Sequence, residues 1–579
     1  MNLLPFAKLP VYRKRRFLPE NIDLGDWIQI APFFDKLEAA ASGCQDSAAF
    51  ERWLLDGSEL AAALDEESSR RYIAMTCHTE NSGAEKAYLH FVEQIEPQLK
   101  PRQFKLAQIF LAHPLRTELP KERYFVFDRA TQVQVELYRP ENVRLETAEA
   151  KLAQQYQKLI GSLTVPFRGQ EQTLARMGRY LEDPDRALRQ DAWEVVARRR
   201  LREAGQIEQI FEQLLKLREQ IAANAGFPDY LQYAFRARGR FDYTPEDCRK
   251  FHEAIAEDIM PVLRVLQSQR RAQLGLDMLR PWDLVVDPLN RPALRPFERI
   301  EDLVAKTRKI FAQLDSKLAD EFTSMRDLQL LDLDNRKGKA PGGYQSTLAE
   351  ARLPFIFMNA VGMQRDVETI LHEAGHAFHA LAAREEDLYA YRSAPIEFCE
   401  VASMSMELLG NEFLEKFYQS DEADRARRDH LEGIVQIFPW IATVDAFQHW
   451  IYSHPGHSRA DRQKAWLDLM DRFGGEVDWT GYEEARTNLW HRQLHIFIHP
   501  FYYIEYGIAQ LGALQVWANS KRNKAQALQQ YHQALSLGGS RPLPELFQTA
   551  GCRFDFSRET VQPLVKLVSA ELAGGVSGP

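Results

Sequence analysis

The sequence predicts a mainly α-helical protein with a small β element beside a histidine-bearing helix. Apolar residues recur at helical spacing through most of the first third, and residues 366–384 repeat the same period. An apolar run at residues 353–358, which follows a glycine-rich loop, has the length and composition of a strand. The clearest helical repeat, in residues 206–222, consists of Ile207, Ile210, Phe211, Leu214, Leu215 and Leu217.

Length and composition fit a folded, water-soluble chain. Because 579 residues exceed one ordinary domain, we expect an N-terminal helical lobe over residues 1–200 and a second region over residues 201–579. A net charge of -9 gives no broad basic face for nucleic acid. No apolar stretch reaches the roughly 20 residues that a membrane-spanning helix requires. The sequence therefore predicts neither a nucleic-acid nor a membrane partner, and it leaves the oligomeric state unknown.

The cysteines are odd in number, far apart in the sequence and without a CxxC pair. This pattern excludes an obvious disulfide framework or thiolate zinc knuckle and favours a reducing, cytoplasmic location. The five cysteines are Cys44, Cys77, Cys248, Cys399 and Cys552.

Two further segments carry structural expectations. Residues 123–138 partly alternate apolar and polar side chains around a turn at residues 129–131, which predicts a short pair of strands. Residues 279–297 contain four prolines, so they are expected to form an extended connection and to mark a lobe boundary.

The helix predicted at residues 366–384 carries the main chemical motif. Its apolar residues fall on one face, which we expect to be core, and His372, His376 and His379 fall on the opposite side. The i,i+4 spacing of His372 and His376 brings two imidazoles within roughly 5–6 Å, where both can bind one zinc ion. The alternative is a solvated helical face on which the histidines coincide by chance.

Glu373 follows the first of these histidines and completes an HExxH pattern. A bound zinc ion lowers the pKa of its water toward about 7, so a neighbouring carboxylate can take the proton near neutral pH. The pattern therefore predicts a hydrolytic site with one Zn²⁺ and with Glu373 as the general base.

The third zinc ligand decides the subclass. A metzincin requires a glycine and a histidine where this chain has His379 and Ala382, so that subclass is excluded. The following predicted helix, residues 395–409, carries Glu397 and Glu400 three positions apart on one face. One of them can bind zinc while the other supports a histidine or the helix.

The segments HEAGHAFH and FCEVASM resemble the thimet oligopeptidase family of zinc peptidases. The resemblance implies that the metal ligands are His372, His376 and Glu400 and that the general base is Glu373. We expect the ligands to be supported by Glu397, His379 and Glu368. Over roughly the last 240 residues, further segments resemble the oligoendopeptidase F branch, namely GKAPGGYQS, RLPFIFMN, RDVETILHEAGHAFH, ATVDAFQHWIY and HPFYYIEYG.

The resemblance also implies an architecture and an activity. The fold would be a multi-helical, gluzincin-type zincin in which two helical lobes border a deep channel, and the activity would be cleavage of internal bonds in oligopeptides. The region after residue 200 would be the peptidase region, with its zinc site at 372–400. Two alternatives remain: a non-catalytic peptide-binding protein with a structural metal site, and an exopeptidase with the same fold.

Two segments are expected to contact the substrate. At residues 495–510, the resemblance implies that histidines and tyrosines stabilise the developing oxyanion, and Tyr503 is a further substrate contact. At residues 342–344 and 353–358, the loop and an exposed edge strand are expected to pair with an extended peptide. The candidates for the oxyanion are His495, His499, Tyr502 and Tyr506, and those of the loop are Gly342, Gly343 and Tyr344.

Three other histidines, His449, His454 and His457, share no helical ligand spacing with the predicted zinc site. We expect them to be structural or surface residues.

Overall fold

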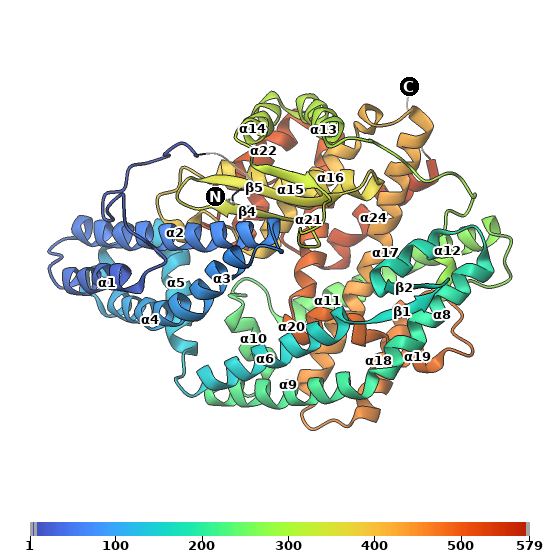
Figure 1. The fold of residues 1–579 in the computed structure, drawn as a ribbon, viewed down its shortest axis with the longest axis horizontal. Helices are drawn as coiled ribbons and strands as arrows, with labels where there is room; N and C mark the ends of the chain where they lie inside the picture. The colour runs from blue at the N-terminus through green and yellow to red at the C-terminus, as the bar shows by residue number, and fades with distance from the viewer. Residues whose placement is uncertain (1–3, 5–7, 575–579) are drawn as a thin grey trace. The chain divides into compact units, whose positions relative to one another are not determined.

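The computed structural model describes residue 4 and residues 8–574, and the mainly helical fold is confirmed (Figure 1). The chain forms two compact units. Unit 1 draws on residues 1–136, 294–428 and 509–554, and unit 2 on residues 137–293, 429–508 and 555–579. The units therefore do not follow the expected division at residue 200, because packing joins segments that are distant in sequence. One unit boundary, at residues 293 and 294, does fall within the proline-rich connection.

The helices are assigned to the units by residue number. Unit 1 holds α1 (Trp27–Ala41), α2 (Ser47–Cys77), α3 (Ser82–His90), α4 (Glu96–Ala112), α5 (Lys121–Leu137), α13 (Ile300–Leu314), α14 (Ser316–Asp327), α15 (Gln364–Ala382), α16 (Ile396–Asn411), α22 (Lys524–Ser536) and α23 (Leu543–Thr549). Unit 2 holds α6 (Asn142–Gly161), α7 (Leu174–Met177), α8 (Arg186–Arg202), α9 (Ala204–Asn224), α10 (Tyr230–Ala237), α11 (Pro245–Ala254), α12 (Met260–Gln273), α18 (Arg459–Phe473), α19 (Glu483–Thr487), α20 (Leu494–Ile498) and α24 (Arg558–Gly574). Helices α17 (Ser420–Ser453) and α21 (Tyr503–Arg522) each contain residues of both units, and the last residue of α5, Leu137, belongs to unit 2.

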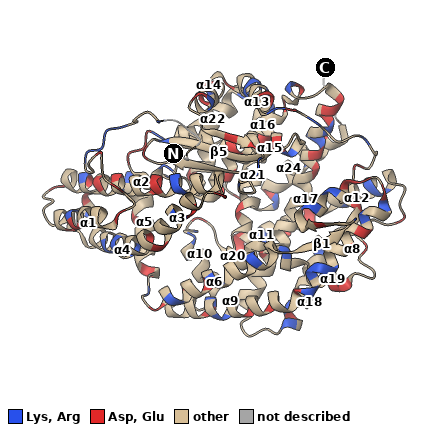
Figure 2. Ribbon diagram, in the orientation of Figure 1, with Lys and Arg blue, Asp and Glu red and all other residues tan. Residues whose placement is uncertain are grey.

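Acidic and basic residues are interspersed along the helices, in keeping with the mixed charge of the sequence (Figure 2). Within the part of the chain that the structure describes, no helix combines the length and the hydropathy needed to cross a bilayer.

Unit 1 contains a three-stranded sheet in the order β3 (Leu331–Asp334), β5 (Leu353–Ala360), β4 (Tyr344–Leu348). Strand β5 runs parallel to β3 and antiparallel to β4. The predicted strand is thus confirmed, but its expected position at an exposed edge is wrong. Its run of apolar residues is buried on both faces, which is typical of a central strand. The edge position on one side belongs to β4 instead.

The predicted strand pair at residues 123–138 is also wrong, because this segment forms helix α5. Tyr124, Phe127 and Thr131 lie three and four residues apart, so a helix places them on one face. Tyr124 and Phe127 pack into the apolar core of α1, α2 and α4. This packing outweighs the β propensity of the aromatic and β-branched residues. The strand pair that was not predicted is β1 (Thr164–Phe167) with β2 (Gln170–Thr173), in unit 2.

Helix α15 packs between the sheet and α16 and is covered on nearly all sides (Figure 1). We expected its histidine-bearing side to face away from the core. That expectation is wrong for His379, whose residue is only 4% exposed, and for Glu373, which is 7% exposed. The physical reason is α16, which covers this side of the helix.

The loop before β4 is anchored by a buried charge pair. The side chain of Lys339 is fully buried, and its Nζ donates to Oδ1 of Asp332 over 2.9 Å. Arg336 donates to the same carboxylate through two nitrogens, at 2.5 and 2.7 Å. Burial acts to raise the pKa of Asp332, but hydrogen bonds from Arg336, Cys77 and Lys339 hold it well below its usual range. The Asp332 carboxylate therefore ties the glycine-rich loop to β3.

Replacing Asp332 by asparagine should lower the free energy of unfolding by about 3–5 kcal/mol, because Lys339 would keep a buried charge without its carboxylate. Denaturant unfolding measures this change. The matched control is Asp334→Asn: Asp334 also pairs with Arg336, at 2.8 Å, but its side chain is 50% exposed. The control should lose no more than about 1 kcal/mol. Equal losses in the two variants would contradict the role given to the buried pair.

Candidate metal centre

Helix α15 is positioned by its first turn. The Asp366 carboxylate accepts hydrogen bonds from the backbone N–H groups of Val361 and Met363, at 2.8 and 2.9 Å. These bonds fix the entry of the chain from β5 into the helix, and a carboxylate in the first turn also suits the helix dipole. Residues 372–376, two turns further on, are thereby held against the neighbouring elements.

His372, His376 and Glu400 converge as the resemblance implied. The two imidazole centroids are 4.9 Å apart on α15. The Oε2 atom of Glu400, from α16, lies 3.4 Å from Nε2 of His372 and 3.7 Å from Nε2 of His376. One ligand atom from each of the three residues lies within 4.8 Å of the others.

These separations fit a zinc ion. Bonds of about 2.0–2.2 Å in a tetrahedral arrangement hold the donor atoms roughly 3.3–3.6 Å apart. The two measured separations from Glu400, 3.4 and 3.7 Å, are close to that range. Two imidazoles and one carboxylate are also the donor set of catalytic zinc sites that keep a fourth position open.

Gly375 allows the two helices to meet. A Cβ atom at this position would lie 2.6 Å from Cα of Ser403 and 2.7 Å from the carbonyl oxygen of Ala402. The backbones of α15 and α16 are therefore in direct contact one turn after Glu400. Tyr531 of α22 donates to the same Ala402 carbonyl oxygen over 2.8 Å, which ties α22 to α16 at this contact.

A second carboxylate orients the first histidine. Nδ1 of His372 donates to Oε1 of Glu407 over 2.6 Å, which leaves Nε2 directed toward Glu400. Ser403 donates to Oε2 of Glu400 over 3.0 Å. Such outer hydrogen bonds fix the tautomer and orientation of metal ligands. Neither Glu407 nor Ser403 was predicted, although Glu407 lies seven residues after Glu400 and so shares its helical face.

The centre carries an excess of negative charge. Glu373, Glu400 and Glu407 surround two imidazoles, and burial raises the pKa of Glu373 to about 7, with the charges of the other two glutamates acting in the same direction. Burial acts to lower the pKa of His372, but its bond to Glu407 and the surrounding carboxylates raise it to about 9. A divalent cation would balance this charge.

The residues expected to support the ligands lie in different surroundings. His379 is buried, packs edge to face on Phe398 at 6.0 Å, and has its pKa lowered to about 4 by burial. Glu397 is buried in the first turn of α16. Glu368 accepts a hydrogen bond from Gln364, one turn earlier on α15. Their support of the zinc site stays a prediction.

The loop before β4 reaches the same centre through its backbone. Gly342 has a φ of 101°, and a Cβ at Gly343 would lie 3.3 Å from Cγ2 of Thr369 on α15. The Tyr344 hydroxyl forms a 2.6 Å hydrogen bond with Thr76 of α2, so it is already engaged. Helix α15, which carries Glu373, packs against β4. Strand β4 therefore lies beside the predicted general base.

The predicted histidine and tyrosine cluster forms in unit 2. The ring of His495 lies 5.7 Å from that of Tyr502, 4.9 Å from Tyr503 and 6.0 Å from Tyr506. Tyr502 and Tyr506 are 5.4 Å apart, as their shared face predicted. Burial lowers the pKa of His495 to about 4 and also lowers that of His499. Both imidazoles are therefore neutral near neutral pH.

The cluster sits on a constrained turn. Phe501 adopts a positive φ of 63°, which is rare for a bulky residue, and its N–H donates to Gln448 over 2.8 Å. Arg238 donates to the carbonyl of Pro500 over 2.8 Å and lies over the Tyr502 ring. Tyr503 is buried, and burial raises the pKa of its hydroxyl. Tyr502 and Tyr506 remain partly exposed.

Comparison with known proteins adds a family match. The family model "Peptidase family M3" matches residues 179–565, and "Peptidase M3 N-terminal domain" matches residues 18–138. The Lactococcus lactis oligoendopeptidase F homologue is 26% identical over 192 residues, which cover 33% of this chain and 31% of the relative. The Bacillus subtilis oligopeptidase PepF is 23% identical over 319 residues, 54% of this chain and 46% of the relative. The chain thus aligns with less than half of the length of each of these relatives.

Solved structures match over nearly the whole chain. PZ peptidase A with an inhibitor superimposes with a TM-score of 0.87 at 27% identity, covering 96% of this chain and 99% of the other. A structure described as an oligoendopeptidase F also gives a TM-score of 0.87, at 28% identity, covering 97% and 99%. The resemblance inferred from the sequence motifs is confirmed.

Replacing Gly375 by alanine should force α15 and α16 apart and displace Glu400 from the two histidines. We expect zinc affinity to fall by about 10–100-fold, and the free energy of unfolding to fall by about 1–3 kcal/mol. Competition titration with a chromophoric chelator and denaturant unfolding measure the two effects.

Gly433→Ala, in the middle of α17, is the matched control because an added Cβ there meets nothing within 4 Å. That variant should keep its zinc affinity and gain up to about 1 kcal/mol from helix propensity. Unchanged zinc binding in the Gly375 variant would show that the contact between the helices does not place the ligands.

Proposed function

The chain belongs to peptidase family M3, in its oligoendopeptidase F branch, and on this premise we propose that it is a zinc-dependent endopeptidase acting on oligopeptides. The observation that carries the proposal is the convergence of His372, His376 and Glu400 next to the buried carboxylate of Glu373. The substrate class is supported by the relatives, which are named oligopeptidases and oligoendopeptidases.

The zinc ion would be held by His372, His376 and Glu400. Glu373 would transfer a proton from the attacking water to the leaving amine. When bound, zinc polarises a carbonyl group and acidifies a water molecule. The Glu373 carboxyl, with a pKa of about 7, can accept a proton from the attacking water and return it to the leaving amine near neutral pH. Glu407 keeps His372 in one orientation, so the ligand does not have to reorganise during the reaction.

Strand β4 is the element we propose for binding the substrate backbone. It ends the sheet, and it packs against α15, the helix that carries Glu373. An extended peptide that adds to a sheet edge presents its backbone in a fixed register, which suits cleavage with little dependence on side chains. Gly342, Gly343 and the backbone of Tyr344 lead into this strand and are the proposed contacts.

For stabilisation of the oxyanion, we propose the cluster of His495, His499, Tyr502 and Tyr506. Neutral imidazoles and partly exposed phenols can donate a hydrogen bond to a developing negative charge without losing a proton. Tyr503 is a weaker candidate for substrate contact because its side chain is buried.

A cytoplasmic location is part of the proposal. All five cysteines are free thiols, and three of them are buried, so a reducing compartment suits the chain.

The Glu373→Gln variant tests the catalytic role. It should retain zinc, because the three ligands are untouched, and lose turnover of a quenched fluorescent peptide by about 10²–10⁴-fold. Metal analysis measures the retained zinc, and kcat measures the turnover of the peptide. Glu422→Gln removes an exposed carboxylate in the first turn of α17 and should leave both unchanged. Undiminished turnover in the Glu373 variant would refute the assignment of the general base.

A peptide blocked at both ends separates the endopeptidase from an exopeptidase. We expect internal cuts, with both blocked ends recovered intact on fragments identified by mass spectrometry. An exopeptidase would leave this peptide whole while shortening its unblocked form. A chelator should abolish the internal cuts, since the zinc ligands are required.

A further inference from the structure

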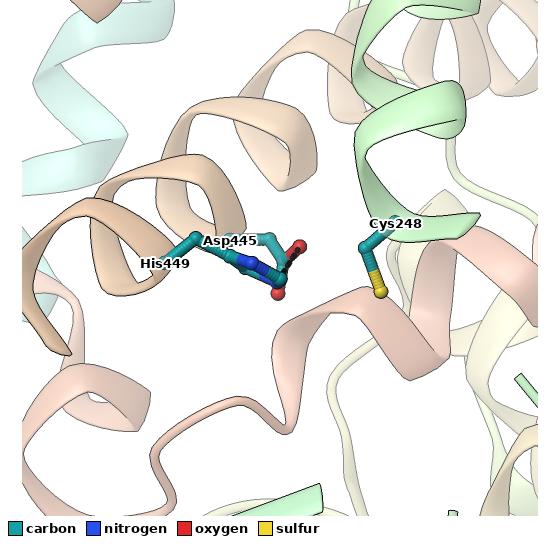
Figure 3. Close-up of side chains that lie close together, drawn as sticks. All are labelled: Cys248, Asp445 and His449. Atoms are coloured by element: carbon teal, nitrogen blue, oxygen red, sulfur yellow. Dashed lines mark ion pairs between the residues drawn. The ribbon is translucent and has the colours of Figure 1, made fainter. Parts of the chain in front are cut away.

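Unit 2 contains a second cluster of metal-binding side chains. Cys248 comes from α11, and Asp445 and His449 come from successive turns of α17. One ligand atom from each residue lies within 4.8 Å of the others, and all three residues are buried. Figure 3 shows Cys248 on one helix and Asp445 beside the His449 ring on another, with a dashed line for the ion pair of Asp445 with His449.

Several atoms of this cluster have no hydrogen-bond partner among the described residues. They are Oδ1 of Asp445 and both ring nitrogens of His449. Asp445 is fully buried and His449 is only 7% exposed. Nε2 of His449 lies 3.3 Å from Oδ2 of Asp445, but without the angles of a hydrogen bond. Each buried polar atom left unpaired costs about 1–3 kcal/mol. A further group bound between these side chains would offset that cost.

His252 holds the Asp445 carboxylate. Its Nε2 donates to Oδ2 of Asp445 over 2.8 Å, and Oδ1 has no hydrogen-bond partner among the described residues. His252 also lies one turn after Cys248 on α11, so the same pair of helices supplies all four side chains. A ligand carboxylate held by an outer histidine is a recurring arrangement in metal sites.

We propose that Cys248, Asp445 and His449 form a second metal site, separate from the peptidase centre, that takes zinc and joins α11 to α17. A thiolate, an imidazole and a carboxylate are the donor types that zinc accepts together. A zinc ion would balance the two negative charges of the carboxylate and the thiolate. It would also satisfy one carboxylate oxygen of Asp445 and one ring nitrogen of His449.

Binding requires a proton to leave. Burial holds the pKa of the Cys248 thiol well above its ordinary value, and the charge of Asp445 raises it further. The thiol therefore gives up its proton to solvent as the metal–sulfur bond forms, so that one proton is released for each ion bound at Cys248. Because the three residues are buried, the ion would enter while the chain folds.

Cobalt substitution tests this proposal, because a sulfur-to-cobalt charge-transfer band in the near ultraviolet requires a thiolate ligand. The peptidase centre has no sulfur ligand, so the band reports the second site alone. Wild-type protein expressed in cobalt-supplemented, zinc-depleted medium should show the band and carry about two cobalt ions per chain, one for each three-residue group. Protein without the band would overturn the proposal, whether or not it cleaves peptides.

Two variants locate the sulfur ligand. Cys248→Ser should lose the band and about one equivalent of cobalt while retaining peptidase activity. Cys399→Ser is the matched control, because Cys399 adjoins Glu400 and is the competing thiol. A band that follows Cys399 instead of Cys248 would refute the second site.

A third variant distinguishes failure of the second metal site from failure of the proposed peptidase function. A His376→Ala variant, which removes a ligand from the peptidase centre, should lose activity and keep the band. If the band disappears together with the peptidase metal, the thiolate does not belong to an independent site.

Discussion

The close contact of α15 with α16 at Gly375 is the constraint on which the metal centre depends. Zinc ligands from two helices must meet within a few ångströms, and side chains on both helices would normally keep their backbones further apart. With no side chain at Gly375, the two backbones touch beside Ser403 and Ala402. Glu400, one turn before Ser403, is thereby brought to the edges of His372 and His376. The glycine gives up some helix propensity in exchange for this approach.

The packing of α15 against α16 and the sheet also determines the pKa of Glu373 and the charge balance around it. Burial beneath α16 and the sheet raises the pKa of Glu373 into the range where a carboxyl can both accept and return a proton. Glu407 and Glu400 add negative charge that a divalent cation would offset. Strand β4 completes the arrangement, since it lies at the edge of the sheet and packs against α15, the helix that carries Glu373. The positions of the proposed ligands, the charge around Glu373 and the position of the proposed substrate-binding strand thus all depend on the packing of α15 against α16 and the sheet.

The sequence predicts best what is encoded within a single helix. His372, Glu373 and His376 form a local motif, and their relation in space follows from helical geometry alone. Glu400 required the family resemblance, because the position of one helix against another is not visible in spacing. Glu407 was missed although it shares the Glu400 face. The edge position of the strand at residues 353–358 was predicted wrongly because strand order depends on pairing between distant segments. The strand pair predicted at residues 123–138 was wrong because the aromatic residues of α5 suit both patterns. His449 was expected to be structural or at the surface, and its proximity to Cys248 emerges only in the folded chain.

A crystal structure with an anomalous difference map at the zinc absorption edge tests the central claim most directly. The account predicts a peak about 2.0–2.2 Å from Nε2 of His372, from Nε2 of His376 and from a carboxylate oxygen of Glu400. Protein that hydrolyses peptides but shows no metal peak bonded to these three residues would contradict it.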